Sequence, residues 1–213
     1  MNAQPFSFPP DFFRRDDDGP DAFFYDEPRL VVHIDERAVE TVRSYLDDVL
    51  PTDATVLDLM SSWRSHLPMP PGNRHVVGLG MNATELAENP QLHERIVHDL
   101  NAEPALPLES RRFDAAIITV SVQYITRPVE LFAEVRRTLK EGATFHVIFS
   151  DRMFATKAVA IWKSLPDHQR RGELIGTYFG ASQGWDQPMF LDRSPTSDGS
   201  SDPLYVVRAA RVG

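Results

Sequence analysis

Residues 54–63 decide the fold, and they read Ala-Thr-Val-Leu-Asp-Leu-Met-Ser-Ser-Trp. The apolar run from Ala54 to Leu59 has the length and composition of a short strand that is buried on both faces, as in a parallel sheet covered by helices. Asp58 lies inside this run. Because a carboxylate that ends a buried strand needs a partner, we expect Asp58 to contact a ligand, with the capping of a turn as the alternative.

Short apolar runs of strand length alternate with stretches of helical periodicity along most of the chain. Further strands are predicted over Arg74–Leu79, Arg95–Asp99, Phe113–Val120 and Ala143–Phe149. Helices are predicted from the N-cap Asp35 to Leu50, from near Asn82, over Pro128–Leu139 with Gly142 as terminator, and over Thr156–Leu165 and Gln169–Phe179. Alternation of this kind predicts an α/β fold with a parallel sheet and helices on both faces.

The last two strand-like segments, Pro188–Leu191 and Leu204–Ala209, have no helix between them. A polar loop over 193–202 joins them, so we expect an antiparallel edge. The prediction is a seven-stranded sheet that is mostly parallel and ends in an antiparallel last strand.

Residues 1–34 differ in composition from the single domain predicted over 35–213. They are rich in Pro, Phe and Asp and have no sustained periodicity. The many aromatic residues, Phe6 and Phe8 among the first, favour an irregular arm that packs on the domain as a possible lid. A partner-binding segment and a partly disordered tail are the alternatives.

Bulk composition excludes several classes of function. The formal charge of −9 disfavours a nucleic-acid partner, which requires clustered basic residues. There is no cysteine, and no His or carboxylate set has metal-ligand spacing, so we predict no metal. The start of the chain lacks signal-peptide character and no apolar run could span a bilayer, which predicts a cytoplasmic protein without a membrane partner.

Several short motifs occur in an order that resembles the class I S-adenosylmethionine-dependent methyltransferases. They are Val56-Leu57-Asp58-Leu59, Asp99-Leu100, Leu106-Pro107-Leu108 before Phe113-Asp114-Ala115, and Arg137-Thr138-Leu139-Lys140-Glu141-Gly142. The ending Asp202–Val207 resembles the final antiparallel strand of that family. The likeness covers roughly Thr52 to Arg208 and implies the Rossmann-like methyltransferase sandwich.

The resemblance implies S-adenosylmethionine as cofactor and assigns positions to it. Asp58 would hold the methionine end through its ammonium group, and Asp99 would accept a hydrogen bond from the adenine amino group. The remaining implied cofactor-binding positions follow the predicted strands: Met60, Ser61, Ser62, Gly80, Met81, Asn82, Leu100, Val120 and Ser121.

Two of these positions depart from the family pattern. The usual Gly-x-Gly turn is here Met60-Ser61-Ser62, whose hydroxyls could contact the methionine carboxylate in a turn that need not be left-handed. The second strand usually ends in an acid that binds both ribose hydroxyls, and Asn82 could be a neutral substitute. Met60 and Trp63 are otherwise packing residues, and their side chains could fill the cofactor cradle.

The substrate pocket is predicted from polar residues near these loops. We assign His66 as the catalytic residue, so His66→Asn is predicted to reduce turnover while leaving cofactor binding intact. Tyr25, His33, Gln123 and Tyr124 are the substrate-binding candidates, although His33 between Val32 and Ile34 also fits a half-buried structural histidine.

The predicted function is methylation of a small molecule. A non-catalytic regulatory protein that binds the cofactor or a nucleoside is the alternative. A nicotinamide-dependent oxidoreductase is disfavoured because no Gly-x-Gly-x-x-Gly occurs.

Overall fold

The computed structural model describes residues 8–68 and 72–213, so residues 1–7 of the predicted arm, Phe6 included, lie outside the described residues. The strands of the described chain form one sheet with the order β3-β2-β1-β4-β5-β7-β6. Their bounds are β1 (Thr55–Leu59), β2 (His75–Gly80), β3 (Glu94–Val97), β4 (Phe113–Thr119), β5 (Leu139–Phe149), β6 (Met189–Asp192) and β7 (Tyr205–Ala210).

Strands β1 to β5 are parallel, and β7 pairs antiparallel with both β5 and β6. The predicted sheet is therefore confirmed, including its antiparallel last strand. The strand order reverses beside β1, which is the place where open α/β sheets bind ligands.

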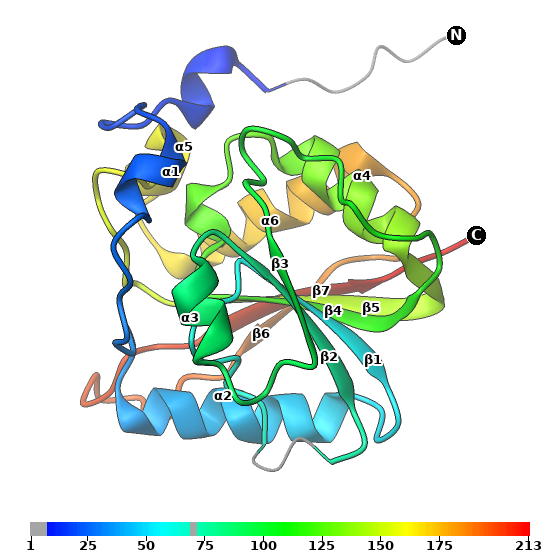
Figure 1. Ribbon diagram of the computed structural model, residues 1–213. Helices are drawn as coiled ribbons and strands as arrows, with labels where there is room; N and C mark the ends of the chain where they lie inside the picture. The colour runs from blue at the N-terminus through cyan, green and yellow to red at the C-terminus, as the bar shows by residue number, and fades with distance from the viewer. Residues whose placement is uncertain (1–7, 69–71) are drawn as a thin grey trace, which may run out of the picture.

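Helices cover both faces of the sheet (Figure 1). Helix α2 (Glu36–Val49) packs on one face, and α4 (Pro128–Thr138) and α6 (His168–Ser182) pack on the other. Successive side chains of a strand point to opposite faces. Accordingly, Val56 belongs to the core under α2, and Leu57 belongs to the core under α4 and α6. Asp35 caps α2 by accepting a hydrogen bond from the amide of Ala38 at 3.0 Å, as predicted.

Two element boundaries differ most from the predictions. Helix α4 ends at Thr138 and β5 starts at Leu139, so Gly142 lies inside a strand rather than after a helix. Its φ of +77° accommodates an irregularity where the pairing of β4 with β5 shifts register. Helix α5 (Ala160–Ser164) is also shorter than the predicted Thr156–Leu165.

The described part of the arm, residues 8–34, packs along one side of the domain. It contains the short helices η1 (Pro10–Phe13) and α1 (Asp21–Phe24). Figure 1 shows it in blue, running from the start of α2 past α3 (Ala83–Ala87) to α5. Phe8 and Phe13 pack against Tyr178 of α6, with ring centroids 5.5 and 6.2 Å from that of Tyr178. No helix among the described residues is long and apolar enough to cross a membrane.

Candidate functional site

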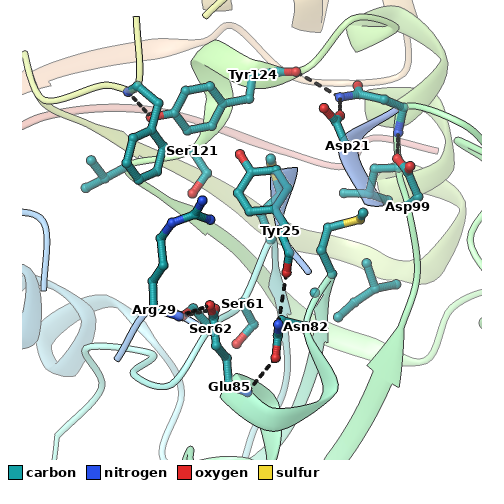
Figure 2. Close-up of a pocket in the computed structure, with 18 of the residues that line it drawn as sticks. Asp21, Tyr25, Arg29, Ser61, Ser62, Asn82, Glu85, Asp99, Ser121 and Tyr124 are labelled. Carbon is teal, nitrogen blue, oxygen red and sulfur yellow. Dashed lines mark hydrogen bonds between the residues drawn. The ribbon is translucent and has the colours of Figure 1, made fainter. Parts of the chain in front are cut away.

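A cavity of about 320 Å³ lies at the carboxyl ends of the parallel strands. Its walls come from the loops after β1, β2, β3, β4 and β5, and residues of the arm close it (Figure 2). This volume falls within the range of small-molecule sites. Met60 lines the cavity without filling it, and Trp63 is not among its lining residues, so neither side chain plugs the cradle.

The turn after β1 takes the shape that a glycine would usually adopt there. Met60 has a φ of +53°, in the left-handed region, so the expectation that the turn need not be left-handed is wrong. The Ser61 amide donates to the carbonyl oxygen of Leu79 at 2.9 Å. A Cβ at Gly80 would overlap the Ser61 carbonyl oxygen, so glycine on β2 allows this close approach.

Asp58 is a buried carboxylate behind this turn. It is 3% exposed and accepts a hydrogen bond from Ser61 Oγ at 2.6 Å. Burial raises its pKa to about 7, against the hydrogen bonds from Ser61 and Ser65. Asp58 lines a side cavity of about 80 Å³ that shares Ser61 and Ser62 with the larger one. None of the described Lys or Arg side chains pairs with it.

The polar side chains after β2 form hydrogen bonds with the arm. Asn82 caps α3 through Oδ1, and its Nδ2 donates to the carbonyl oxygens of Tyr25 and Asp26, both at 2.9 Å. Glu85 accepts from the Arg29 amide at 2.7 Å and from Ser62 Oγ at 2.6 Å. Asn82 and Glu85 both line the cavity. The assignment of Asn82 to a ribose stays a prediction that its contacts do not favour.

Glu85 is a cavity residue that the sequence analysis missed. It is a carboxylate three residues after the N-cap Asn82, in the first turn of α3, and it is 8% exposed. That spacing is the one signal that could have drawn attention to it.

The loop after β3 presents Asp99 and Leu100 to the cavity, as the family resemblance implied. Asp99 Oδ1 accepts from the amides of Asn101 and Ala102 at 2.9 and 3.1 Å, which shapes the loop and leaves Oδ2 for a ligand. Asn101 also lines the cavity and ties this loop to the arm, because its Nδ2 donates to Asp21 Oδ2 at 2.7 Å.

The loop after β4 brings Val120, Ser121 and Tyr124 to the cavity. Val120 has a φ of +52°, which is strained for a β-branched residue, and such strain concentrates at functional sites. Gln123 does not line the cavity: it is 1% exposed, and its Nε2 donates to the carbonyl oxygens of Val120 and Arg152. Its role as a substrate residue stays a prediction that the structure does not favour.

The arm contributes Tyr25, Arg29 and His33 to the cavity wall. Figure 2 shows Tyr25 and Arg29 pointing toward the side where Ser121 and Tyr124 lie. The Arg29 guanidinium packs 4.5 Å from the ring centroid of Phe24. Burial is the main cause that lowers the pKa of His33, which packs edge-on against Phe154.

A buried ionic cluster holds the arm in place. Asp21 is 5% exposed and accepts from Arg15 Nη1 at 2.7 Å, and Lys157 Nζ lies 3.1 Å from it. Lys157 is 1% exposed and also contacts the Asp17 carboxylate at 3.1 Å. The arm is therefore attached both to the loop before α5 and, through Asn101, to the loop after β3.

His66, the predicted catalytic residue, lies outside the main cavity. It lines the side cavity near Asp58 and a surface groove beside α2. Burial lowers its pKa to about 4, so the imidazole is neutral and weakly basic at pH 7. The catalytic assignment stays a prediction that this position does not favour.

We therefore expect His66→Asn to change turnover by less than about threefold, because general-base catalysis is worth roughly a hundredfold or more. Steady-state rates at saturating substrate measure this effect. A hundredfold loss at unchanged cofactor affinity would restore His66 as the base.

Comparison with known proteins agrees with this geometry. Residues 64–147 match the model of a family described as a methyltransferase domain. The chain is therefore similar to class I methyltransferases over 84 of its 213 residues. Its sheet order and antiparallel last strands are those of a Rossmann-like methyltransferase. No curated protein matches this chain.

Solved structures share the methyltransferase fold at low identity. The [4+2]-cyclase SpnF superposes with a TM-score of 0.59 at 14% identity, over 83% of this chain and 82% of that one. Geranyl diphosphate C-methyltransferase from Streptomyces coelicolor A3(2), solved with S-adenosyl-L-homocysteine, superposes with a TM-score of 0.59 at 13% identity, over 90% and 97%.

Phosphoethanolamine N-methyltransferase 2 from Haemonchus contortus, solved with S-adenosyl-L-methionine, gives a TM-score of 0.57 at 13% identity, over 82% of this chain and 53% of that one. The present chain therefore spans about half of that protein. At these identities the similarity shows the fold.

Proposed function

We propose that the protein binds S-adenosylmethionine in the cavity and transfers its methyl group to a small molecule beneath the arm. The observation that carries this proposal is the buried Asp58 carboxylate without a cationic partner among the described side chains, directly behind the turn that borders the cavity. A buried carboxylate of this kind is costly unless a positive group compensates it. The ammonium group of the cofactor is such a partner.

Other cavity residues fit the remaining parts of the cofactor. We assign Asp99 Oδ2 to accept from an adenine amino group, with Leu100 beside the ring, because both residues line the cavity. Glu85 is the acid closest in sequence to the end of β2 that also lines the cavity, so we assign it to the ribose hydroxyls in place of Asn82. Both oxygens of Glu85 keep a free lone pair for this contact.

When bound, S-adenosylmethionine supplies an electrophilic methyl group, and its transfer leaves the bonding electron pair on sulfur. The protein's part is to align the acceptor and exclude water. Ser121 and Tyr124 border the acceptor side, and Tyr25 and Arg29 of the arm close it. A general base is needed only if the acceptor is protonated at working pH.

Calorimetry with S-adenosylhomocysteine tests this proposal. We expect binding at one site per chain, and roughly ten- to a hundredfold weaker binding of S-inosylhomocysteine, because Asp99 would then face a carbonyl oxygen instead of an amino group. In Asp99→Asn the side-chain amide can donate to the inosine carbonyl oxygen. The preference for S-adenosylhomocysteine over S-inosylhomocysteine should therefore shrink or reverse. Equal binding of both nucleosides by the wild-type protein would contradict the adenine site, and no binding of either would contradict the proposal.

A second candidate is a non-catalytic protein that binds the cofactor or a nucleoside and acts in regulation. It is favoured by the contacts of Asn82, whose side chain is engaged by the arm and by the α3 cap rather than left for a ligand. Binding of S-adenosylhomocysteine without methyl transfer to any of a broad panel of acceptors would support it.

A further inference from the structure

We propose that the substrate carries an anionic group, a carboxylate or a phosphate, that binds the guanidinium of Arg29. This inference rests on the proposed function and names the substrate class of the same cavity. Arg29 Nη1 is buried and has no hydrogen-bond partner among the described residues. Its Nη2 donates to the carbonyl oxygen of Phe24 at 2.8 Å. One side of the planar fork is therefore fixed, and the other keeps unused donors.

An unpaired buried donor is unfavourable, and it is most unfavourable on a charged group. An acceptor inside the cavity removes this penalty. A carboxylate or phosphate matches the geometry of the guanidinium fork better than a neutral oxygen does, because charge-assisted hydrogen bonds are the stronger ones.

Arg29 is held rigidly enough to recognise a ligand. Its amide donates to Glu85, and its guanidinium stacks on Phe24 at 4.5 Å from the ring centroid and lies 5.6 Å from that of Phe154. Stacking on aromatic rings lets an arginine keep its charge in a poorly hydrated place. Less side-chain freedom is then lost when an anion binds.

The position of the guanidinium points to the substrate rather than to the cofactor. Phe154 follows β5 and Tyr124 follows β4, and their rings are stacked with centroids 6.0 Å apart. The proposed adenine and ribose contacts follow β3 and β2, on the other side of β1. Figure 2 shows the Arg29 guanidinium directed toward Ser121 and Tyr124, on the other side of the view from Asp99.

Arg152 and His98, which also line the cavity, already have hydrogen-bond partners. Arg152 donates from Nε to Asp202 Oδ1 at 2.8 Å, and the ring of His98 bonds the Glu103 carbonyl oxygen at 2.7 Å. The acids Asp21 and Glu85 are engaged by the arm and its neighbours. Among the described guanidinium groups that line the cavity, Arg29 is the one with an unpaired buried nitrogen.

The test is a titration of the protein, preloaded with S-adenosylhomocysteine, with benzoate, phenyl phosphate and the neutral isostere benzamide. We expect at least one of the two anions to bind about tenfold or more tightly than benzamide. In Arg29→Met this preference should disappear, and in Arg29→Lys it should survive in part. Arg152→Gln removes one positive charge from the same cavity and should keep the preference.

The outcomes separate this inference from the proposed function. Failure of S-adenosylhomocysteine to bind contradicts the proposed function itself. Binding of S-adenosylhomocysteine with no preference for anions in the wild-type protein overturns the anionic substrate, and this result does not depend on any variant being folded. Equal loss of the preference in Arg152→Gln also overturns it, because the effect is then general charge.

One further measurement checks the alternative source of an anion, the cofactor's own carboxylate. If Arg29→Met lowers the affinity for S-adenosylhomocysteine tenfold but leaves the affinity for 5′-methylthioadenosine unchanged, Arg29 binds the cofactor carboxylate and the inference is wrong. If neither nucleoside is affected, the substrate site is supported.

Discussion

Replacing Asp58 by asparagine will stabilise the ligand-free protein at pH 8 and weaken its binding of S-adenosylhomocysteine. The folded-state pKa of Asp58 is about 7, and its ordinary value is 3.8. The folded state therefore holds this proton more tightly than the unfolded state does. The resulting contribution to the free energy of unfolding is complete below pH 3.8, falls as the pH rises, and is lost above pH 7.

The size of this loss is about 4 kcal/mol, on the order of 1.4 kcal/mol for each pH unit between the two pKa values. Asparagine does not titrate, so the variant avoids this loss. Denaturant unfolding of both proteins at pH 5 and pH 8 measures this loss. The variant should exceed the wild type in free energy of unfolding by more at pH 8 than at pH 5. An equal difference at both pH values would contradict a buried carboxylate that ionises near neutral pH.

Asp114→Asn is a matched control for charge and residue type. Burial opposes ionisation of Asp114, but the hydrogen bonds from Lys140 and the Thr55 amide outweigh it and lower the pKa. Its stabilising contribution is complete above its ordinary pKa and falls only in more acidic solution. Asp114→Asn should therefore show no added advantage at pH 8 over pH 5.

The same Asp58→Asn variant should bind S-adenosylhomocysteine roughly ten- to a hundredfold more weakly, because an attraction between charges becomes a neutral hydrogen bond. A gain in stability together with a loss of binding is typical of residues that are kept for function. Unchanged affinity by calorimetry would exclude contact between Asp58 and the ammonium group.

Replacing Asp21 by asparagine will release the arm while leaving the sheet folded. Arg15 would then be buried beside a neutral group, and Lys157 would keep only the partly exposed Asp17 as its partner. Losing one partner of a buried ion pair costs about 3–5 kcal/mol. Hydrogen exchange should increase over residues 8–28 and remain slow in β1, β4 and β5. Uniform loss of protection across the sheet would show that the arm and domain unfold together.

Asp16→Asn is the control for this second prediction. Asp16 pairs with Lys163 at 2.7 Å, but its side chain is 66% exposed. Exposed pairs contribute about 1 kcal/mol or less, so exchange over the arm should change little. Proteolysis at the arm should likewise accelerate in Asp21→Asn and remain near the wild-type rate in the control.

Local sequence was sufficient to predict the sheet. Residues such as Val56 and Ile117 occur in short apolar runs that are visible without any tertiary contact. The order of the strands in the sheet came only from the structure. The loops after those strands were predicted as the site, since the carboxyl ends of parallel strands lie at one edge. Asp99, Ser121 and Tyr124 line the main cavity and Asp58 lines the side cavity, and their roles there stay predictions.

Only the tertiary structure decided how the remaining polar groups are used. Arg29 meets Glu85 across 56 residues of sequence, and nothing in either local pattern indicates that contact. The side chain of Asn82 binds the arm, and His66 lies outside the main cavity. Secondary structure follows from short-range periodicity, whereas the pairing of buried polar groups depends on which distant segments fold against each other.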